Sequence, residues 1–426
     1  MFCKTDETKE TTSLENPVLP RIKRERIVSL DALRGFDIFL LLFLSIYGAF
    51  SSGPVATYWG DSAFWQAFTP QMNHHPWHGF RLCDLIMPLF LFMTGATIPL
   101  SLSKYVGPDG LRPTVRTWWR IVRRVLLLWI FGMMIQGNLL ALVPSNFKFY
   151  SNTLQAIAAG YFISCLVYLF LPRWSQWLTF FLLLFAYWGA FTWLKFGDYG
   201  GGSFDPDTNL AYGIDVAVLG RFRNITEIGE NGEIIFNTGY QYTWVFSSLT
   251  FAATTLSGMF AGELLNRSHR KEQSSDTPVE KKRPLQYKTF AILLVAGLVS
   301  LTLGILWDAI PAGKFGYCPN IKIIWTPSMV LYSSGLSLLL LAFFYLFYDV
   351  IKLTWLKTFF VVLGMNAFTA YILSHVLHFE QIASWVLYGL EQYTGVWYGT
   401  ILAVGGFWLL WYLLWAMYRC GKFLRV

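Results

Sequence analysis

Residues Asn73 to Pro99 read NHHPWHGFRLCDLIMPLFLFMTGATIP and join a histidine-rich loop to a long apolar run. The loop holds three of the six histidines of the chain, His74, His75 and His78, and one carboxylate, Asp84, follows just inside the apolar run. Ionisable groups are costly to place at membrane depth, so a cluster of them at the mouth of a membrane helix tends to mark a site. The alternative is that these histidines are solvated groups that flank a helix end and have no function of their own.

The composition of the chain indicates a membrane protein. Of its 426 residues, 55% are hydrophobic and only 14% are charged, whereas a soluble domain carries about 25% charged residues. Several apolar runs reach the length of about 20 residues that a helix needs to cross a bilayer. We therefore predict an all-α fold, a polytopic membrane protein with about ten transmembrane helices. The predicted spans lie near residues 34–53, 82–103, 121–142, 153–171, 175–195, 242–265, 288–310, 327–348, 355–378 and 398–418.

The basic residues are distributed unequally between the two sides of the predicted membrane protein. The chain has 33 Lys and Arg and a net charge of +8, and most of the basic residues fall in short loops on the side that both termini share. This positive-inside pattern predicts cytoplasmic N and C termini, and it argues against nucleic acid as a partner. The N-terminal residues are polar and lack an apolar core, so we expect no cleavable signal peptide.

Two long connections divide the predicted spans. Residues 1–33 form a cytoplasmic tail, residues 34–265 a first transmembrane bundle with the candidate active site, and residues 288–426 a second bundle. The segment between the bundles, 266–287, is basic and contains Ser and Pro, so we expect a flexible cytoplasmic linker. Residues 196–241 are rich in Gly, Asp and Asn, which predicts ordered outer loops that could cap a cavity.

The candidate catalytic pair is His74 and Asp84. A histidine titrates near neutral pH and can take a proton from an attacking amine or hydroxyl. A partly buried carboxylate can hold the imidazole in the correct tautomer, although Asp84 could instead cap a neighbouring backbone. The five cysteines show no close pair and no metal-ligand spacing, so we expect no metal site.

Arginines near the cytoplasmic side are candidate phosphate ligands. In SLDALRGFD, the residues Asp31, Arg34 and Asp37 share one helical face, which is consistent either with an ion pair within the helix or with a phosphate anchor at Arg34. Arg120 and Arg124 belong to a basic stretch that is mostly topological or contacts anionic lipids. One or two of its arginines could also meet the phosphates of a cytoplasmic cofactor.

Other polar residues occur inside or beside the apolar runs. Gln155 in NTLQAIAAGY is a candidate interhelical hydrogen-bonding group. Lys322 and Trp325 in PNIKIIWTPS have the spacing either of an interfacial belt or of a site. Asn366 and His375 lie within a spanning run, where polar groups need partners.

Taken together, these motifs resemble one family. HHPWHG followed by DLIMPLFLFMTG resembles the bacterial and lysosomal transmembrane acyltransferases related to heparan-α-glucosaminide N-acetyltransferase. SLDALRGFD is similar to the opening helix of that family, NTLQAIA to its Leu-Gln motif, and IKIIWTPS and GMNAF to its later motifs. The resemblance implies that acetyl-CoA binds as a co-substrate on the cytoplasmic side, and that an amino sugar or glycan is acetylated on the other side.

The resemblance also implies roles for individual residues. It makes His74, three positions before Trp77, the catalytic histidine, with Asp84 beside it. The cofactor-binding candidates are Arg34, Arg120 and Arg124. The substrate-binding candidates are Trp77, His78, Gln155, Lys322, Trp325 and Asn366. Because the chain lacks the large lumenal N-terminal region of the eukaryotic enzyme, we expect a multi-pass protein of the bacterial inner membrane, with the lipid bilayer as a partner and a homodimer left open.

Two functions remain open at this stage. The first is an acetyl-CoA-dependent N- or O-acetyltransferase, by direct transfer or through an acetyl-histidine intermediate. The second is a carrier that moves an amino sugar, for example in cell-wall recycling, through the same polar cavity without chemistry. Similarity of fold does not by itself decide between them.

Overall fold

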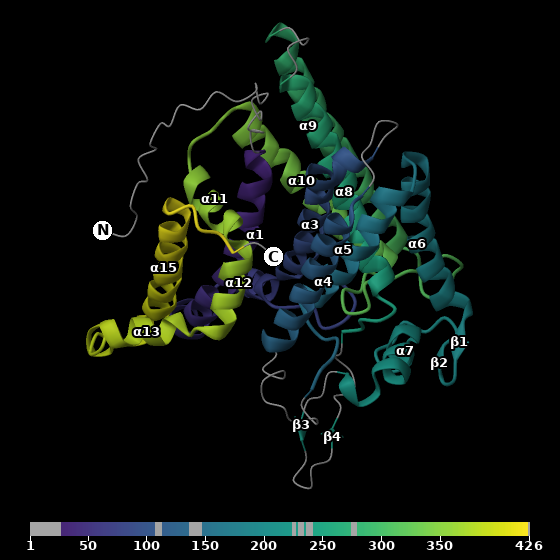
Figure 1. Cartoon of the computed structure of the whole chain (residues 1–426). Helices are drawn as coiled ribbons and strands as arrows, with labels where there is room; N and C mark the ends of the chain where they lie inside the picture. Colours follow the sequence, from purple (N-terminus) through teal and green to yellow (C-terminus); the bar gives the residue numbers. More distant parts are fainter. Residues whose placement is uncertain are drawn as a thin grey trace.

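The computed structural model describes residues 27–106, 113–135, 147–223, 227–228, 234–235, 242–273 and 279–424. Helices build nearly all of this part of the chain, with two small hairpins at one end (Figure 1). The long helices are α1 (Val28–Phe50), α3 (Ile86–Leu102), α4 (Val115–Ile135), α5 (Thr153–Phe170), α6 (Arg173–Trp193), α8 (Ser248–Gln273), α9 (Val279–Asp308), α10 (Pro327–Tyr345) and α15 (Tyr398–Arg419). The shorter α-helices are α2 (Ala63–Phe68), α7 (Leu210–Leu219), α11 (Lys357–Met365), α12 (Ala367–Val376), α13 (Phe379–Val386) and α14 (Glu391–Thr394).

Short irregular elements connect these helices. Two stretches are π-helical, Ser51–Trp59 and Leu346–Val350. The 3₁₀ turns are Thr69–Met72, Leu82–Leu85, Ser103–Tyr105, Gly220–Phe222 and Gly395–Trp397. The strands β1 (Lys195–Phe196) and β2 (Tyr199–Gly200) pair antiparallel, as do β3 (Glu227–Ile228) and β4 (Ile234–Ile235).

The helix composition is that of a multi-pass membrane protein. Among the described residues, six helices are long and apolar enough to cross a membrane, and the bent pair α11–α12 raises this number to seven. Each of the ten predicted spans overlaps a helix, but α4, α6 and α8 fall outside those seven. α4 carries four arginines in its first half and α8 ends in a charged stretch. Ten spans and cytoplasmic termini therefore stay predictions, and residues 136–142 of the third predicted span lie outside the described residues.

The first helix begins earlier than expected, at Val28. The Asp349 carboxylate accepts the backbone N–H groups of Val28 at 3.1 Å and of Ser29 at 3.2 Å. A carboxylate is a favourable partner for the unsatisfied amides of a helix N-terminus. This contact from beyond the end of α10 fixes the start of α1 and places Arg34 within its second turn.

Residues 266–273 and 279–287 are helical where the sequence suggested a flexible linker, and the linker between two bundles stays a prediction. α8 continues to Gln273 and α9 begins at Val279, and residues 274–278 lie outside the described part of the chain. The charges that suggested a linker support helix instead, because Arg267 pairs with Glu263 one turn away at 2.8 Å. Across the two helices, Gln286 donates to Glu272 at 2.9 Å.

Glycines allow α3 and α8 to pack backbone against backbone. A Cβ atom on Gly95 would lie 1.8 Å from the carbonyl oxygen of Thr255, and one on Gly258 would lie 1.9 Å from that of Phe92. Gly262, one turn further along α8, is equally close to α3. Small residues at such spacing let membrane helices approach closely. The contact holds α3 in place, and the candidate site lies at the start of α3.

A second close contact joins helices that are distant in sequence. A Cβ atom on Gly35 of α1 would lie 1.8 Å from the carbonyl oxygen of Phe360, and one on Gly364 of α11 would lie 1.8 Å from that of Asp31. Figure 1 shows α1 beside α11 accordingly. The division into two bundles stays a prediction. In the structure, α1 of the predicted first bundle packs against α11 of the predicted second bundle.

The predicted outer segment is ordered where the structure describes it. The side chain of Asn209 caps α7 by accepting the Tyr212 N–H at 2.8 Å. The buried carboxylate of Asp215 accepts the backbone N–H groups of Trp244 at 2.7 Å and of Val245 at 3.0 Å. These bonds tie α7 to the segment that leads into α8.

Candidate active site

Asp84 is held at the centre of the candidate site by four hydrogen bonds. It lies in the 3₁₀ turn before α3 and is only 1% exposed. One carboxylate oxygen, Oδ2, accepts the backbone N–H groups of Arg81 at 3.0 Å and of His75 at 3.3 Å. The other, Oδ1, lies 2.8 Å from His74 Nδ1 and 3.1 Å from Lys322 Nζ. The sequence left open whether Asp84 orients His74 or caps the backbone. In the structure one conformer of Asp84 makes both kinds of contact.

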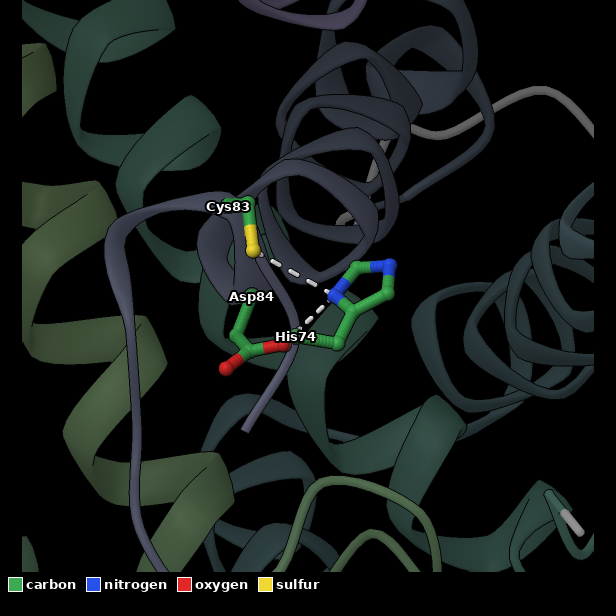
Figure 2. Close-up of side chains that lie close together, drawn as sticks. All are labelled: His74, Cys83 and Asp84. Atoms are coloured by element: carbon green, nitrogen blue, oxygen red, sulfur yellow. Dashed lines mark hydrogen bonds and ion pairs between the residues drawn. The ribbon is translucent and has the colours of Figure 1, made fainter. Parts of the chain in front are cut away.

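The contact with Asp84 fixes the tautomer of His74. A carboxylate oxygen 2.8 Å from Nδ1 requires a proton between the two atoms, so Nδ1 carries the hydrogen and Nε2 of a neutral ring keeps a lone pair. Lys322 Nζ lies 3.3 Å from Nδ1 and donates to Asp84 instead. In Figure 2 the Nε2 atom points away from both Asp84 and Cys83. The side chain of His74 is 47% exposed, so this nitrogen is accessible to a ligand.

Lys322 reaches Asp84 from a loop that a buried tryptophan anchors. Trp325 is fully buried, adopts a positive φ of 50°, and donates its indole N–H to Thr254 at 3.0 Å. Its backbone N–H donates to the Lys322 carbonyl at 3.0 Å. A bulky residue in the left-handed region is strained and persists only where its surroundings fix it. Trp325 therefore supports the position of Lys322 from outside the cavity.

The histidine-rich loop pairs with the Lys322 loop. Gly79 N–H donates to the carbonyl of Asn320 at 2.9 Å, and His78 forms a backbone bridge with Ile321. The imidazole of His78 is 2.7 Å from Asp308, at the end of α9. His78 therefore links the two loops, and its ring is turned toward Asp308.

Trp77 also connects the loop to the rest of the protein. Its indole N–H donates to the carbonyl of Phe204 at 3.1 Å, and its ring packs against the apolar cluster around Phe191 and Ile324. The roles of Trp77 and His78 as substrate-binding residues stay predictions, because both side chains bond to the protein.

A cavity of about 290 Å³ opens beside His74. This volume is close to the lower limit for ligand pockets. Polar groups and aromatic rings both line it. The lining includes His74, Cys83, Lys322, Ser151, Asn152, Thr153, Phe90, Tyr242, Trp244, Tyr371 and His375.

A smaller cavity of about 120 Å³ adjoins the first and contains two arginines. Arg34 of α1 and Arg124 of α4 line it, and Phe90, Thr153 and Tyr371 line both cavities. Arg34 lies 3.3 Å from Asp31, so the ion pair expected from the sequence is present. Arg124 lies over the ring of Tyr161, 4.4 Å from its centroid.

The remaining predicted cofactor and substrate residues lie outside the linings of these two cavities. Arg120 is exposed on α4, one turn before Arg124. Gln155 is fully buried; it accepts the N–H groups of Ser151 and Asn152 and donates to the carbonyl of Phe149 at 2.7 Å. Gln155 thus holds the backbone that forms one cavity wall.

Asn366 occupies the break between α11 and α12, where the chain bends by 74°. Its side-chain amide donates to the carbonyls of Val362 at 3.0 Å and of Leu414 at 3.3 Å. The bend directs α12 toward the cavities: Tyr371 lines both, and His375 lines the one beside His74. The predicted substrate-binding role of Asn366 stays a prediction.

The chemistry of the cluster argues against a metal ion at Asp84. Donor atoms of His74, Cys83 and Asp84 lie within 4.8 Å of one another (Figure 2). However, the ammonium group of Lys322 already lies 3.1 Å from Asp84 and 3.3 Å from His74. A metal cation would meet this like charge at close range. The sequence expectation of no metal stays a prediction.

Several cavity residues were missed at the sequence level. Tyr242 and Trp244 follow the long outer segment without any recognisable motif. Tyr371 lies one helical turn before His375, which was already noted within the predicted span, and that spacing was the available signal for a shared face. Cys83 precedes Asp84 directly, and its Sγ lies 3.4 Å from His74 Nδ1.

The chain is similar to known proteins along most of its length. Residues 26–195 match a family described as "Domain of unknown function (DUF5009)". The chain is 24% identical over 399 residues to heparan-alpha-glucosaminide N-acetyltransferase of Mus musculus, which covers 85% of this chain and 55% of the mouse protein. It is 22% identical over 385 residues to the Homo sapiens protein of the same name, covering 82% of this chain and 52% of that protein.

The chain is distantly related to these acetyltransferases. It spans about half the length of the curated relatives it matches. The similarity to the acetyltransferases extends well beyond the matched DUF5009 region, which contains His74 and Asp84 and ends before Lys322.

Proposed function

We propose that this chain is a membrane-embedded acyltransferase that uses acetyl-CoA to acetylate an amine or hydroxyl of an amino sugar or glycan. The observation that carries the proposal is the His74–Asp84 pair at a cavity that shares three lining residues with a cavity containing Arg34 and Arg124. The distant relatives are named as N-acetyltransferases of heparan-alpha-glucosaminide, which supports the reaction class.

In this proposal each cavity takes one substrate. Guanidinium groups bind phosphate through paired donors, so Arg34 and Arg124 hold the coenzyme end of acetyl-CoA, with Arg120 nearer the cytoplasm. The acceptor occupies the cavity beside His74, whose Nε2 takes the proton of the attacking nitrogen or oxygen. Asp84 maintains the tautomer of His74, and Lys322 forms an ion pair with the Asp84 carboxylate. Transfer is direct, and attack by Nε2 on the thioester would be the acetyl-histidine variant.

The proposal includes a location. Both termini are cytoplasmic, the membrane is the bacterial inner membrane, and the acceptor meets the thioester from the outer side. The basic residues near the termini support this orientation. A homodimer is compatible with the proposal but not required by it.

One observation favours the second candidate, a carrier of an amino sugar. The α11–α12 pair is broken by a 74° bend, and interrupted helices at a polar cavity are a feature of secondary transporters. A carrier would use the same cavity but would leave the sugar unmodified.

Purified protein in proteoliposomes, with radiolabelled acetyl-CoA and a panel of amino sugars and glycans, separates the two candidates. Acetylated product, identified by mass spectrometry, is expected of the acyltransferase. Uptake of an unmodified amino sugar, with no acetylated product across the panel, would replace it with the carrier.

A further inference from the structure

The two cavities meet at three side chains. Phe90, Thr153 and Tyr371 line both the cavity beside His74 and the cavity of Arg34 and Arg124. Phe90 is apolar. Among these shared residues, the hydroxyl groups of Thr153 and Tyr371 are therefore the side-chain hydrogen-bond donors at the junction.

Tyr371 is held rigidly at the junction. It is 9% exposed, and its ring contacts Phe90 with centroids 6.4 Å apart and His375 with centroids 4.5 Å apart. Its hydroxyl interacts with the side chains of Asn152 and Thr153. Its position thus depends on ring packing as well as on its hydroxyl.

Thr153, on the other side of the junction from Tyr371, is also held in place. It is the first residue of α5, directly after the N-cap residue Asn152. Gln155 fixes this turn by accepting the backbone N–H of Asn152 at 3.0 Å, and Asn152 in turn accepts the Leu154 N–H at 2.8 Å. Donors that are fixed before the reaction cost no reorganisation when charge develops, which is the condition for effective electrostatic catalysis.

We infer that the hydroxyl groups of Tyr371 and Thr153 donate hydrogen bonds to the thioester oxygen of the acyl donor and stabilise the oxyanion formed during transfer. This inference rests on the proposed function. An acyl group that arrives from the arginine cavity and an acceptor held beside His74 can meet only where the two cavities join. The carbonyl oxygen of the acyl group then replaces the contact between the Tyr371 and Thr153 hydroxyl groups and accepts from both.

The step balances with these residues. The lone pair of the acceptor nitrogen forms the new C–N bond, and the carbonyl π electrons move to the oxygen, which accepts the two hydroxyl hydrogen bonds. His74 Nε2 takes the proton from the nitrogen. The C–S bond then breaks, its electrons leave with the coenzyme thiolate, and the carbonyl re-forms. Neither hydroxyl loses its proton.

Lys322 is a poorer candidate for this role. Its ammonium group is 3.1 Å from the Asp84 carboxylate and its side chain is 7% exposed. It lines the first cavity but not the second. Its charge is neutralised by Asp84, and it does not lie at the junction.

The test uses substitutions that remove one hydroxyl and little else. Tyr371→Phe keeps the ring and also the backbone carbonyl, which accepts from His375 at 2.8 Å. Thr153→Val keeps the shape of the side chain, and Thr153→Ser restores the hydroxyl. Tyr332→Phe is the control, because Tyr332 packs against Phe80 and lines neither cavity. Steady-state kinetics of acetyl transfer are measured for each variant, with thermal unfolding as the measure of folding.

We expect Tyr371→Phe to lower kcat by about 10²–10³, the usual effect of removing one oxyanion donor, with KM for both substrates unchanged. Thr153→Val should lower kcat in the same way, Thr153→Ser should recover most of it, and Tyr332→Phe should match the parent. If the parent is active and both single variants keep its kcat, the inference is overturned while the proposed function stands. A loss of kcat that follows a loss of thermal stability, without recovery in Thr153→Ser, would also overturn it. A parent that acetylates no acceptor would overturn the proposed function and this inference together.

Discussion

His74 Nδ1 lies 2.8 Å from Asp84 Oδ1, a hydrogen bond that closes a loop of ten positions. The two residues differ sharply in exposure, since Asp84 is 1% exposed and the side chain of His74 is 47% exposed. The carboxylate is thus fixed inside the protein, while the imidazole presents its other nitrogen to the cavity. This arrangement is what a general base requires: one nitrogen held and one free.

Replacing His74 tests the general base. His74→Ala should lower turnover by about 10²–10⁴, the usual contribution of a positioned acid–base group, while coenzyme binding persists. His75→Ala is the matched control. The ring of His75, the next residue along the chain, packs against Gly79, and burial lowers the pKa of His75. Acetylated product is quantified by mass spectrometry for folded variants. Undiminished acetylation by His74→Ala would remove His74 from the mechanism.

Replacing Asp84 tests the tautomer. Asp84→Asn should lower kcat by about 10²–10⁴, because an amide no longer fixes the proton on Nδ1. It should also destabilise the protein by about 3–5 kcal/mol, since it leaves the buried ammonium of Lys322 without a partner. The double variant Asp84→Asn/Lys322→Met should recover stability but not activity. Recovery of both, measured by thermal unfolding and turnover, would show that Asp84 serves folding alone.

Replacing Arg34 tests the coenzyme cavity. Arg34→Ala should weaken coenzyme binding by about 1.5–3 kcal/mol, the range for a hydrogen bond to a charged group. Arg34→Lys should recover only part of the lost coenzyme affinity, because an ammonium lacks the paired donors of a guanidinium. Arg116→Ala, on the exposed face of α4, is the control. Isothermal titration with coenzyme A provides the affinities, and an unchanged value for Arg34→Ala would leave this residue with only its Asp31 ion pair.

Replacing Gly258 tests the α3–α8 contact. Gly258→Ala would place a Cβ atom 1.9 Å from the Phe92 carbonyl oxygen, so the helices must separate. We expect a loss of about 1–3 kcal/mol, as for other overpacked sites, visible as a lower unfolding temperature in detergent. Gly48→Ala in α1 is the control, because no atom lies within 4 Å of its Cβ position. Equal stability of the two variants would contradict the close contact.

The pH dependence of stability tests Asp215. Burial raises the pKa of this carboxyl from its ordinary value of 3.8 to about 7, against the lowering effect of its two backbone hydrogen bonds. A folded pKa above the unfolded value gives a stabilising contribution that is complete below the unfolded pKa and is lost as pH rises through about 7. The parent should therefore lose stability relative to Asp215→Asn as pH rises from the unfolded pKa of 3.8 to the folded pKa of about 7, a change that thermal unfolding measures. A difference that does not vary with pH would contradict the raised pKa.

The sequence allowed prediction of features that depend on neighbouring residues. The long apolar runs predicted the helices, and the closeness of His74 and Asp84 in the sequence allowed the pair to be proposed. The partnership of Lys322 with Asp84 was not predictable, because 238 residues separate them. The histidine-rich loop and the Lys322 loop must pair before Asp84 and Lys322 come into contact, and no sequence periodicity indicates that pairing. The break at Asn366 and the left-handed Trp325 also depend on tertiary contacts.

The helical state of the predicted linker residues could not be recognised from composition. Residues 266–273 look like a solvated tail by composition, yet Arg267 pairs with Glu263 one turn earlier in the same helix. Composition alone does not separate a charged linker from a charged helix end. Contacts such as Glu272 with Gln286 decide between them, and they require both helices.

The distance in sequence between Asp84 and Lys322 has a consequence for biogenesis. During synthesis the ribosome adds 238 positions after Asp84 before its cationic partner exists. Until then the nascent chain carries an unneutralised carboxylate at the start of a helix that must enter the bilayer, which is energetically unfavourable. We expect the start of α3 to settle to its final depth only after the Lys322 loop has been translated. Insertion of this protein is then completed by the same contact that assembles its candidate active site.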